Sequence, residues 1–278
     1  MEQRILEQSM RLPPDGAVSG WASLRWQGAA YFTGDGWSEG SHLDVPLLLG
    51  GAGANLRTAK GSVVSKEQFP PGEKILVEGV PCSIVTRALF DEVRRTGSPR
   101  DGAVAIDMAA AARLTSVDEF ADYVETRYAW TGVPLVRKAL ALASDDSRSP
   151  QESRMRLVWV LDAKLPWPLC NVPVFDLAGT LLGYPDLFDP VAGVVGEYDG
   201  ADHLIEDRRR LDIEREQTFR DHGLEYFAVV RGDLRDRQRV ADRMRAARAR
   251  ARFDRPEARR WTLEVPAWFE DSRELRVR

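Results

Sequence analysis

The spacing of apolar residues changes along the chain and predicts different structures in different regions. In the first part, short apolar runs separated by glycine and proline predict strands, after one short helical segment at 19–30. These strands are expected at 43–49, 62–64 and 75–78. Pro46 lacks a backbone N–H, so the first of them is expected at the edge of its sheet. From Val85 onward the apolar residues recur at helical spacing and predict helices at 85–95, 102–112, 117–128 and 133–143.

The last part of the chain alternates between helix and strand patterns. Ser149, Pro150 and Glu152 form an N-terminal helix signal, with a serine cap, proline at the first position and glutamate three residues after the cap. This helix is expected to continue to Pro166. Beyond it, strands are predicted at 172–177, 181–188, 194–199 and 224–230, the first two joined as a hairpin at 178–180. Helices are predicted at 205–222 and, within an arginine-rich stretch, at 235–252.

A polar segment at 144–148 separates these two patterns and is interpreted as a linker. We therefore expect an α/β protein with two domains. The first, 1–143, is a smaller mixed α/β domain whose second half is helical. The second, 149–278, has a core with the element order α-β-β-β-α-β, followed by the arginine-rich helix.

Composition narrows the class of protein. No apolar stretch approaches the roughly 20 residues that span a bilayer, and the first residues lack a signal-peptide pattern. We expect a cytoplasmic protein without a membrane partner. Cys82 and Cys170 are isolated, which argues against a disulfide framework or a zinc site and favours two buried thiols.

The net charge of -4 conceals a strongly basic segment. Residues 235–260 contain eleven arginines and four acids. Within it, Val240, Met244 and Ala247 form an apolar stripe at helical spacing, so a packed helix with its arginines in water is the first interpretation. A phosphate-binding face is the alternative.

Three carboxylates form the most informative pattern for function. Strand alternation places Glu197 and Asp199 on one face, with Val195, of an otherwise apolar strand. If 181–188 pairs beside it, Asp186 supplies a third carboxylate. Like charges at this density require a cation between them, and hard oxygen ligands suit Mg²⁺ or Mn²⁺. The sequence therefore predicts a divalent metal site at Asp186, Glu197 and Asp199.

These residues also carry a family resemblance. Pro185-Asp186, Glu197-Tyr198-Asp199-Gly200, His203, Asp207 and Arg210, in this element order, resemble the PD-(D/E)XK nuclease superfamily and, within it, the branch similar to very-short-patch repair (Vsr-like) endonucleases. The resemblance covers roughly 149–233. It implies a restriction-endonuclease-like core and Mg²⁺-dependent hydrolysis of DNA. In that scheme Asp186 and Glu197 hold the cation, Asp199 binds it or orients water, and His203 assists proton transfer.

The sequence departs from the superfamily pattern at one position, and this leaves a rival hypothesis open. The third motif of the superfamily usually ends in lysine, and here that position is Asp199. The N-terminal half resembles actinobacterial AbiEi-type antitoxins, which suggests a catalytically inactive nuclease-like regulator that binds DNA or a partner protein.

Several of these residues also have a purely structural interpretation. Glu152 is expected mainly as a helix cap. Arg208, Arg209 and Arg210 are expected to form solvated salt bridges with acids three or four residues away, and contact with a DNA backbone is the alternative.

Overall fold

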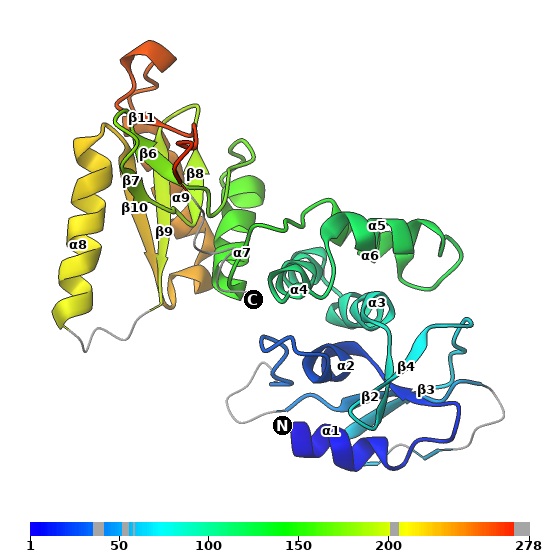
Figure 1. Ribbon diagram of the computed structural model, residues 1–278. Helices are drawn as coiled ribbons and strands as arrows, with labels where there is room; N and C mark the ends of the chain where they lie inside the picture. The colour runs from blue at the N-terminus through cyan, green and yellow to red at the C-terminus, as the bar shows by residue number, and fades with distance from the viewer. Residues whose placement is uncertain (36–41, 52–55, 58, 201–205, 270–278) are drawn as a thin grey trace. The chain divides into compact units, whose positions relative to one another are not determined.

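The computed structural model describes residues 1–278 except 36–41, 52–55, 58, 201–205 and 270–278, and leaves the side chains of 206–212 undescribed. The chain divides into two compact units, Met1–Ser153 and Arg154–Arg278, called here the N-terminal and C-terminal units. Together they form a mixed α/β protein with helices and three sheets, as drawn in Figure 1. In the part of the chain that the structure describes, no helix has the length and apolar character needed to cross a membrane.

The N-terminal unit contains a five-stranded sheet with the order β3-β2-β1-β5-β4. Its strands are β1 (Ala17–Val18), β2 (Val45–Leu48), β3 (Ser62–Ser65), β4 (Lys74–Val77) and β5 (Val80–Ser83). The prediction that the strand containing Pro46 lies at the sheet edge is wrong, because β2 lies between β3 and β1. Val45 and Leu49 donate their N–H groups to Gly61 and Ser65, on the β3 side, so the side of Pro46 that lacks an N–H faces Ser19, just after β1. The carbonyl oxygen of Ser19 accepts from Ser23 instead.

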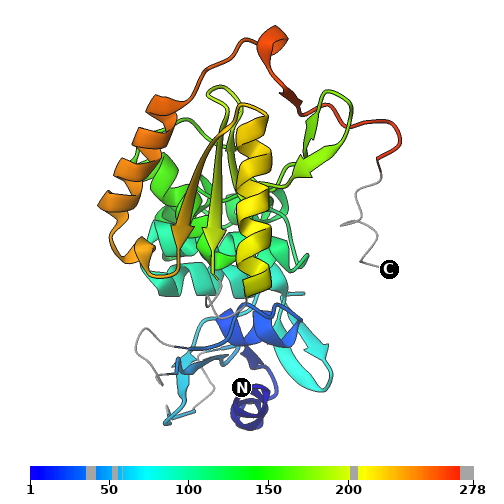
Figure 2. The same cartoon turned by 90° about the vertical axis from the view of Figure 1, so that its left-hand side faces the viewer.

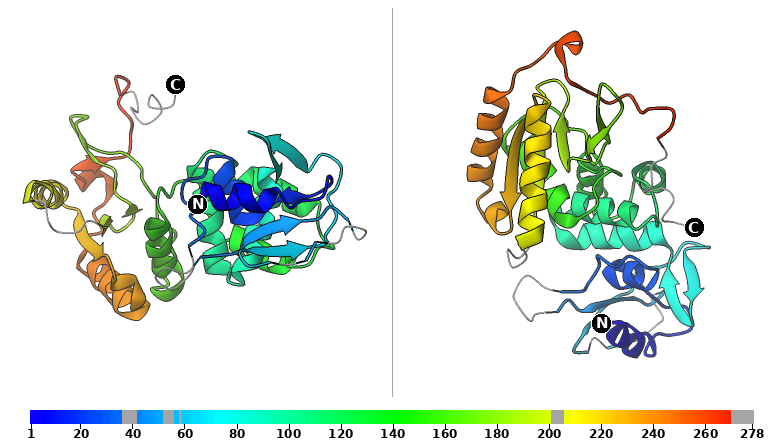
Figure 3. Two further views of the ribbon diagram at one scale, coloured as in Figure 1. Left: turned by 90° about the horizontal axis from the view of Figure 1, so that it is seen from below. Right: turned by 60° about the vertical axis from the view of Figure 1, so that its left-hand side comes forward.

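Six helices accompany this sheet in the described ranges: α1 (Glu2–Ser9), α2 (Gly20–Trp26), α3 (Val85–Thr96), α4 (Pro99–Ala111), α5 (Val117–Glu125) and α6 (Val133–Leu140). The four helices predicted after Val85 are confirmed. Ser98 and Ser116 cap α4 and α5 by accepting from backbone N–H groups three residues later. α3 packs between α2 and α4, and α4 packs on α6. Figure 3 shows α3 and α4 as neighbouring helices.

The C-terminal unit is built around a three-stranded sheet with the order β10-β9-β8. Its strands are β8 (Leu187–Asp189), β9 (Val194–Asp199) and β10 (Glu225–Val230); β9 is antiparallel to β8 and parallel to β10. α7 (Pro150–Leu157), the following π-helical turn η1 (Val158–Asp162) and α9 (Arg237–Arg250) cover one face. α8 (Glu206–Asp221) covers the other. Figure 2 shows β9 and β10 between α9 in orange and α8 in yellow.

A second small sheet has the order β11-β6-β7, with β6 (Val174–Asp176), β7 (Leu181–Gly183) and β11 (Trp261–Thr262). The predicted hairpin at 178–180 is confirmed, since β6 and β7 pair as antiparallel neighbours. The predicted single strand 181–188 is wrong. It is interrupted at Tyr184-Pro185-Asp186, and its halves, β7 and β8, belong to different sheets. Proline cannot donate to a ladder, which favours a break there.

Two short 3₁₀ turns, η2 (Asp233–Arg235) and η3 (Pro256–Ala258), complete the described elements. The apolar stripe predicted for the arginine-rich helix is confirmed, because Val240, Met244 and Ala247 are fully buried in α9. Cys82 and Cys170 are free, buried thiols, as expected.

A candidate carboxylate site on the central strand

Two separate hydrophobic clusters confirm the alternation predicted for β9. Val194 packs with α7, η1 and α9, and Tyr198 lies against the same cluster. Val195 instead packs with Phe188, with Phe219 of α8 and with Trp261 of β11. Strand geometry therefore directs Glu197 to the α8 side of the sheet. Glu197 is largely buried, with 12% of its side chain exposed.

The buried Glu197 carboxylate is paired with Arg215 of α8. Arg215 Nη2 lies 2.9 Å from Glu197 Oε1. The same nitrogen donates a hydrogen bond of 2.6 Å to the carbonyl oxygen of Tyr184, in the break between β7 and β8. The guanidinium thus joins three segments of the chain and neutralises a carboxylate that would be costly to bury alone. At 41% exposure, the Arg215 side chain also reaches the surface.

Asp186 lies directly before β8, at the position that faces Glu197 if the β8–β9 register continues by one residue. Its Oδ2 atom accepts a hydrogen bond of 2.7 Å from the backbone N–H of Tyr198. The side chain thereby supplies the acceptor that a continued β8 backbone would have offered. The structure therefore brings Asp186 to the same end of β9 as Glu197.

Charged groups of both signs lie near the end of β9. Asp199 is the last residue of the strand, and its carbonyl oxygen accepts a hydrogen bond of 3.1 Å from the N–H of Arg231. Burial raises the pKa of the Tyr198 phenol, and the nearby charges of Arg231 and Arg154 act against this rise. The charges that act on the Tyr198 phenol thus include the carboxylates of Asp199 and Asp233 as well as these two arginines.

The predicted metal site is not present as a cluster of three ligands. Across the described residues, no group of three or more histidine, cysteine, aspartate or glutamate side chains is placed to hold a metal ion. Asp186, Glu197 and Asp199 are therefore not gathered as one three-carboxylate group. A cation held by these residues stays a prediction, and the donors available to it here are the carboxylates of Asp186 and Glu197.

The other predicted site residues fall into two groups. His203 lies outside the described residues, and so do the side chains of Arg208, Arg209 and Arg210, although their backbone forms part of α8. Glu152 acts as a cap: Ser149 Oγ accepts from the N–H of Glu152, and a Glu152 carboxylate oxygen accepts from the N–H of Arg148.

The arginine-rich helix α9 uses much of its charge within the C-terminal unit. Arg243 pairs with Asp233, Arg248 with Asp189, and Arg250 with Glu225. These contacts support the interpretation of α9 as a packed structural helix.

Sequence reasoning missed Arg215. The signal was weak but present: Phe219, four residues later, is the buried aromatic residue of α8, and residues four apart lie on the same face of a helix. An arginine on that face points toward the sheet and needs an acidic partner.

Comparison of the chain with protein-family models, with curated proteins and with solved structures finds no match.

Proposed function

We propose that the C-terminal unit is a divalent-cation-dependent endonuclease that hydrolyses DNA phosphodiester bonds. The observation that carries this proposal is Glu197, a carboxylate buried on the central strand of a sheet, next to the strand break that brings in Asp186. A buried acid contributes little to folding stability compared with an apolar residue of similar size. Its placement near a second carboxylate and in contact with Arg215 favours a role in chemistry.

Two carboxylates fit a cation such as Mg²⁺, which takes only a few of its ligands from the protein. Mg²⁺ keeps several waters and is commonly held by one or two carboxylates together with substrate phosphates. Asp186 and Glu197 would hold it. When bound, the cation would polarise the phosphate and lower the pKa of a water molecule.

The remaining roles belong to cationic side chains. Arg215 is long enough and exposed enough to exchange its contact with Glu197 for a phosphate oxygen of the substrate, since guanidinium groups bind both kinds of oxyanion. It supplies the positive charge that a lysine at position 199 would otherwise supply.

The test combines cation binding with DNA cleavage. The wild-type protein, Glu197→Gln and the matched control Glu216→Gln are incubated with supercoiled and single-stranded DNA in Mg²⁺ or Mn²⁺, and Mn²⁺ binding is measured by calorimetry. Glu216 is a half-exposed acid of α8 that pairs with Arg220, so its loss leaves the carboxylate site intact. We expect Glu197→Gln to lose cleavage by at least about 100-fold and to bind Mn²⁺ more weakly. Equal cleavage by both variants, or the absence of cation-dependent cleavage in the wild type, refutes the proposal.

A second candidate is a nuclease-like unit that binds DNA or a partner protein without cleaving. The Arg215–Glu197 pair favours it, because it neutralises the charge of the buried carboxylate without any cation. In this case the wild-type protein binds DNA with a steep salt dependence, does not cleave it in either metal, and is unaffected by Glu197→Gln.

A further inference from the structure

A cavity of about 520 Å³ lies in the N-terminal unit, whereas the carboxylate site belongs to the C-terminal unit. It is bounded by the segment 67–71, by α3 and by residues 129–131. Its volume falls within the range of roughly 300–1,000 Å³ that is usual for small-molecule sites. The lining contains two arginines, two aromatic side chains and one carboxylate.

The two arginines, Arg87 and Arg94, lie two turns apart on α3 and both bind the carboxylate of Glu67. Arg87 Nη2 lies 2.8 Å from Glu67 Oε2, while Arg94 contacts both Glu67 oxygens at 2.8 and 3.0 Å. Arg87 is 1% exposed, so this guanidinium is almost completely buried at the cavity wall. Glu67 is 42% exposed and belongs to no helix or strand.

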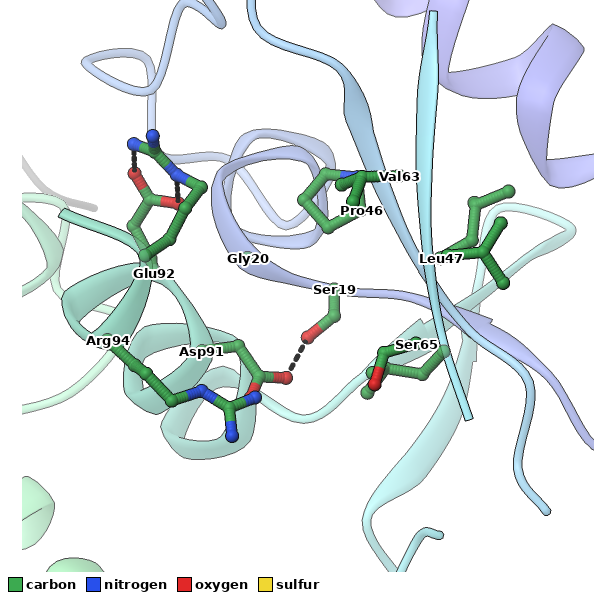
Figure 4. A pocket seen from close by; sticks show the side chains of 12 residues that line it. Ser19, Gly20, Pro46, Leu47, Val63, Ser65, Asp91, Glu92 and Arg94 are labelled. Carbon is green, nitrogen blue, oxygen red and sulfur yellow. Dashed lines mark hydrogen bonds and ion pairs between the residues drawn. The ribbon is translucent and has the colours of Figure 1, made fainter. Parts of the chain in front are cut away.

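The arginines are held in place independently of Glu67. Asp91, buried on the same helix, accepts from Arg87 Nε at 3.0 Å and from Arg94 Nη2 at 2.9 Å. Ser19 donates a 2.6 Å hydrogen bond to Asp91, as Figure 4 shows. Displacement of Glu67 would therefore leave both guanidinium groups in position and able to bind another anion.

Two aromatic side chains, Phe69 and Trp130, line the cavity beside the arginines. The Arg87 guanidinium lies over the Trp130 ring at 4.6 Å and over Phe69 at 5.8 Å, so both rings adjoin the anion-binding groups. Trp130 is fixed by edge-to-face contacts with Phe90 and Tyr123. Arg127 also lies over the Trp130 ring, at 5.5 Å, so a ligand ring would contact the apolar parts of Phe69 and Trp130 that line the cavity rather than a free Trp130 face.

We propose that this cavity binds a phosphate monoester carried on a flat aromatic base, of which a nucleoside monophosphate is the simplest example, and that the Glu67 carboxylate occupies the phosphate position when the ligand is absent. Carboxylates and phosphates both accept paired hydrogen bonds from guanidinium groups. Burial opposes the ionisation of Glu67, yet the hydrogen bonds and charges of Arg94 and Arg87 outweigh it and lower the pKa of this carboxyl. The position thus already favours an anion.

Calorimetric titration with adenosine 5′-monophosphate, adenosine and inorganic phosphate tests the proposal. The monophosphate is expected to bind at least about tenfold more tightly than either fragment, because each fragment engages only one half of the site. Glu67→Gln should tighten monophosphate binding by about tenfold, since it removes the competing charge. Arg94→Gln should weaken it by about tenfold. Arg95→Gln is the matched control: its side chain pairs with Glu92 and lies outside this cavity, so binding should not change.

The Glu67→Gln variant separates ligand binding from a purely structural role. If the carboxylate only stabilises the fold, its loss lowers the melting temperature and leaves monophosphate binding unchanged or weaker, which overturns the proposal. Adenosine or inorganic phosphate binding as tightly as the monophosphate also overturns it. So does the absence of monophosphate binding to the folded wild-type protein at millimolar concentration.

Discussion

Replacement of Gly196 by alanine should destabilise the C-terminal unit. Gly196 lies opposite Phe227 in the β9–β10 register, and a Cβ atom there would lie 2.4 Å from Phe227 Cζ and 2.8 Å from Cε1. Phe227 has little room to move, because it stacks on Trp159 at 5.9 Å between ring centroids. Trp159 is itself held by a 2.7 Å hydrogen bond from its indole nitrogen to the carbonyl of Pro166.

The magnitude follows from two opposing effects. Overpacking of a fixed core costs about 1–3 kcal/mol, and replacing glycine in a strand recovers about 0.5–1 kcal/mol through the unfolded chain. We expect a net loss of about 1–2 kcal/mol in the free energy of unfolding. Because the two units can unfold separately, amide hydrogen exchange of peptides from β9 and β10 is the appropriate assay.

Two further variants make this prediction refutable. Phe227→Leu frees space beside Gly196, so the double variant should be less destabilised than the sum of the two single variants. Gly51→Ala is the control, since a Cβ there meets no atom within 4 Å, and it should alter stability by no more than about 0.5 kcal/mol. Protection of β9 in Gly196→Ala equal to that in the wild type would contradict the packing argument, as would strict additivity in the double variant.

Two other predictions concern buried polar groups. Asp189 is buried, accepts from the N–H groups of Val191 and Ala192, and pairs with Arg248 at 2.8 Å. Asp189→Ala should therefore lower the free energy of unfolding, measured with urea, by about 3 kcal/mol. Asp242→Ala, which removes an exposed pair with Arg245, should lower it by less than about 0.5 kcal/mol. Burial raises the pKa of the Cys82 thiol to about 11, against a smaller opposing effect of the hydrogen bond with Ser23. The folded state therefore favours the neutral thiol, and stability should fall as pH rises from about 8.5 toward 11. Cys82→Ala should show a shallower decline over that window in urea unfolding at pH 8 and pH 10, and an identical decline would contradict the assignment.

Much of the C-terminal unit was predictable because its elements have clear local signals. β9 was located from alternation, α7 from its cap, and α9 from its apolar stripe. The break at Tyr184-Pro185-Asp186 was harder to predict, because the flanking apolar residues continue the strand pattern on both sides. Pro185 favours a break there, but that β7 and β8 belong to different sheets is seen only in the structure.

In the N-terminal unit, the elements that were not predicted carry little local sequence signal. β1 consists of Ala17 and Val18 alone, and two residues carry no periodicity. β5 was missed because Glu78 and Gly79, both with positive φ, form the tight turn from β4, and glutamate is an unusual residue for that conformation. The Arg87, Arg94 and Glu67 cluster joins residues from a helix and a distant loop, so no spacing within one element indicates it.

The candidate carboxylate site was also only partly predictable from the sequence. Residue type and alternation predicted the face of Glu197, but helix periodicity alone does not select Arg215 from the many arginines of α8. The ion pair depends on how α8 is placed over the sheet, which is a property of packing between elements.

The pairing of β11 with β6 has a consequence for synthesis on the ribosome. Trp261 and Thr262 pair with Asp176 and Phe175, so one small sheet joins residues more than eighty positions apart. Contacts of this sequence separation form slowly, and the β6–β7 hairpin emerges from the ribosome long before its third strand. Until then Phe188, which packs edge-to-face on Trp261, lacks a cover on that side. The C-terminal unit therefore completes its core only after Trp261 and Thr262 have left the ribosome.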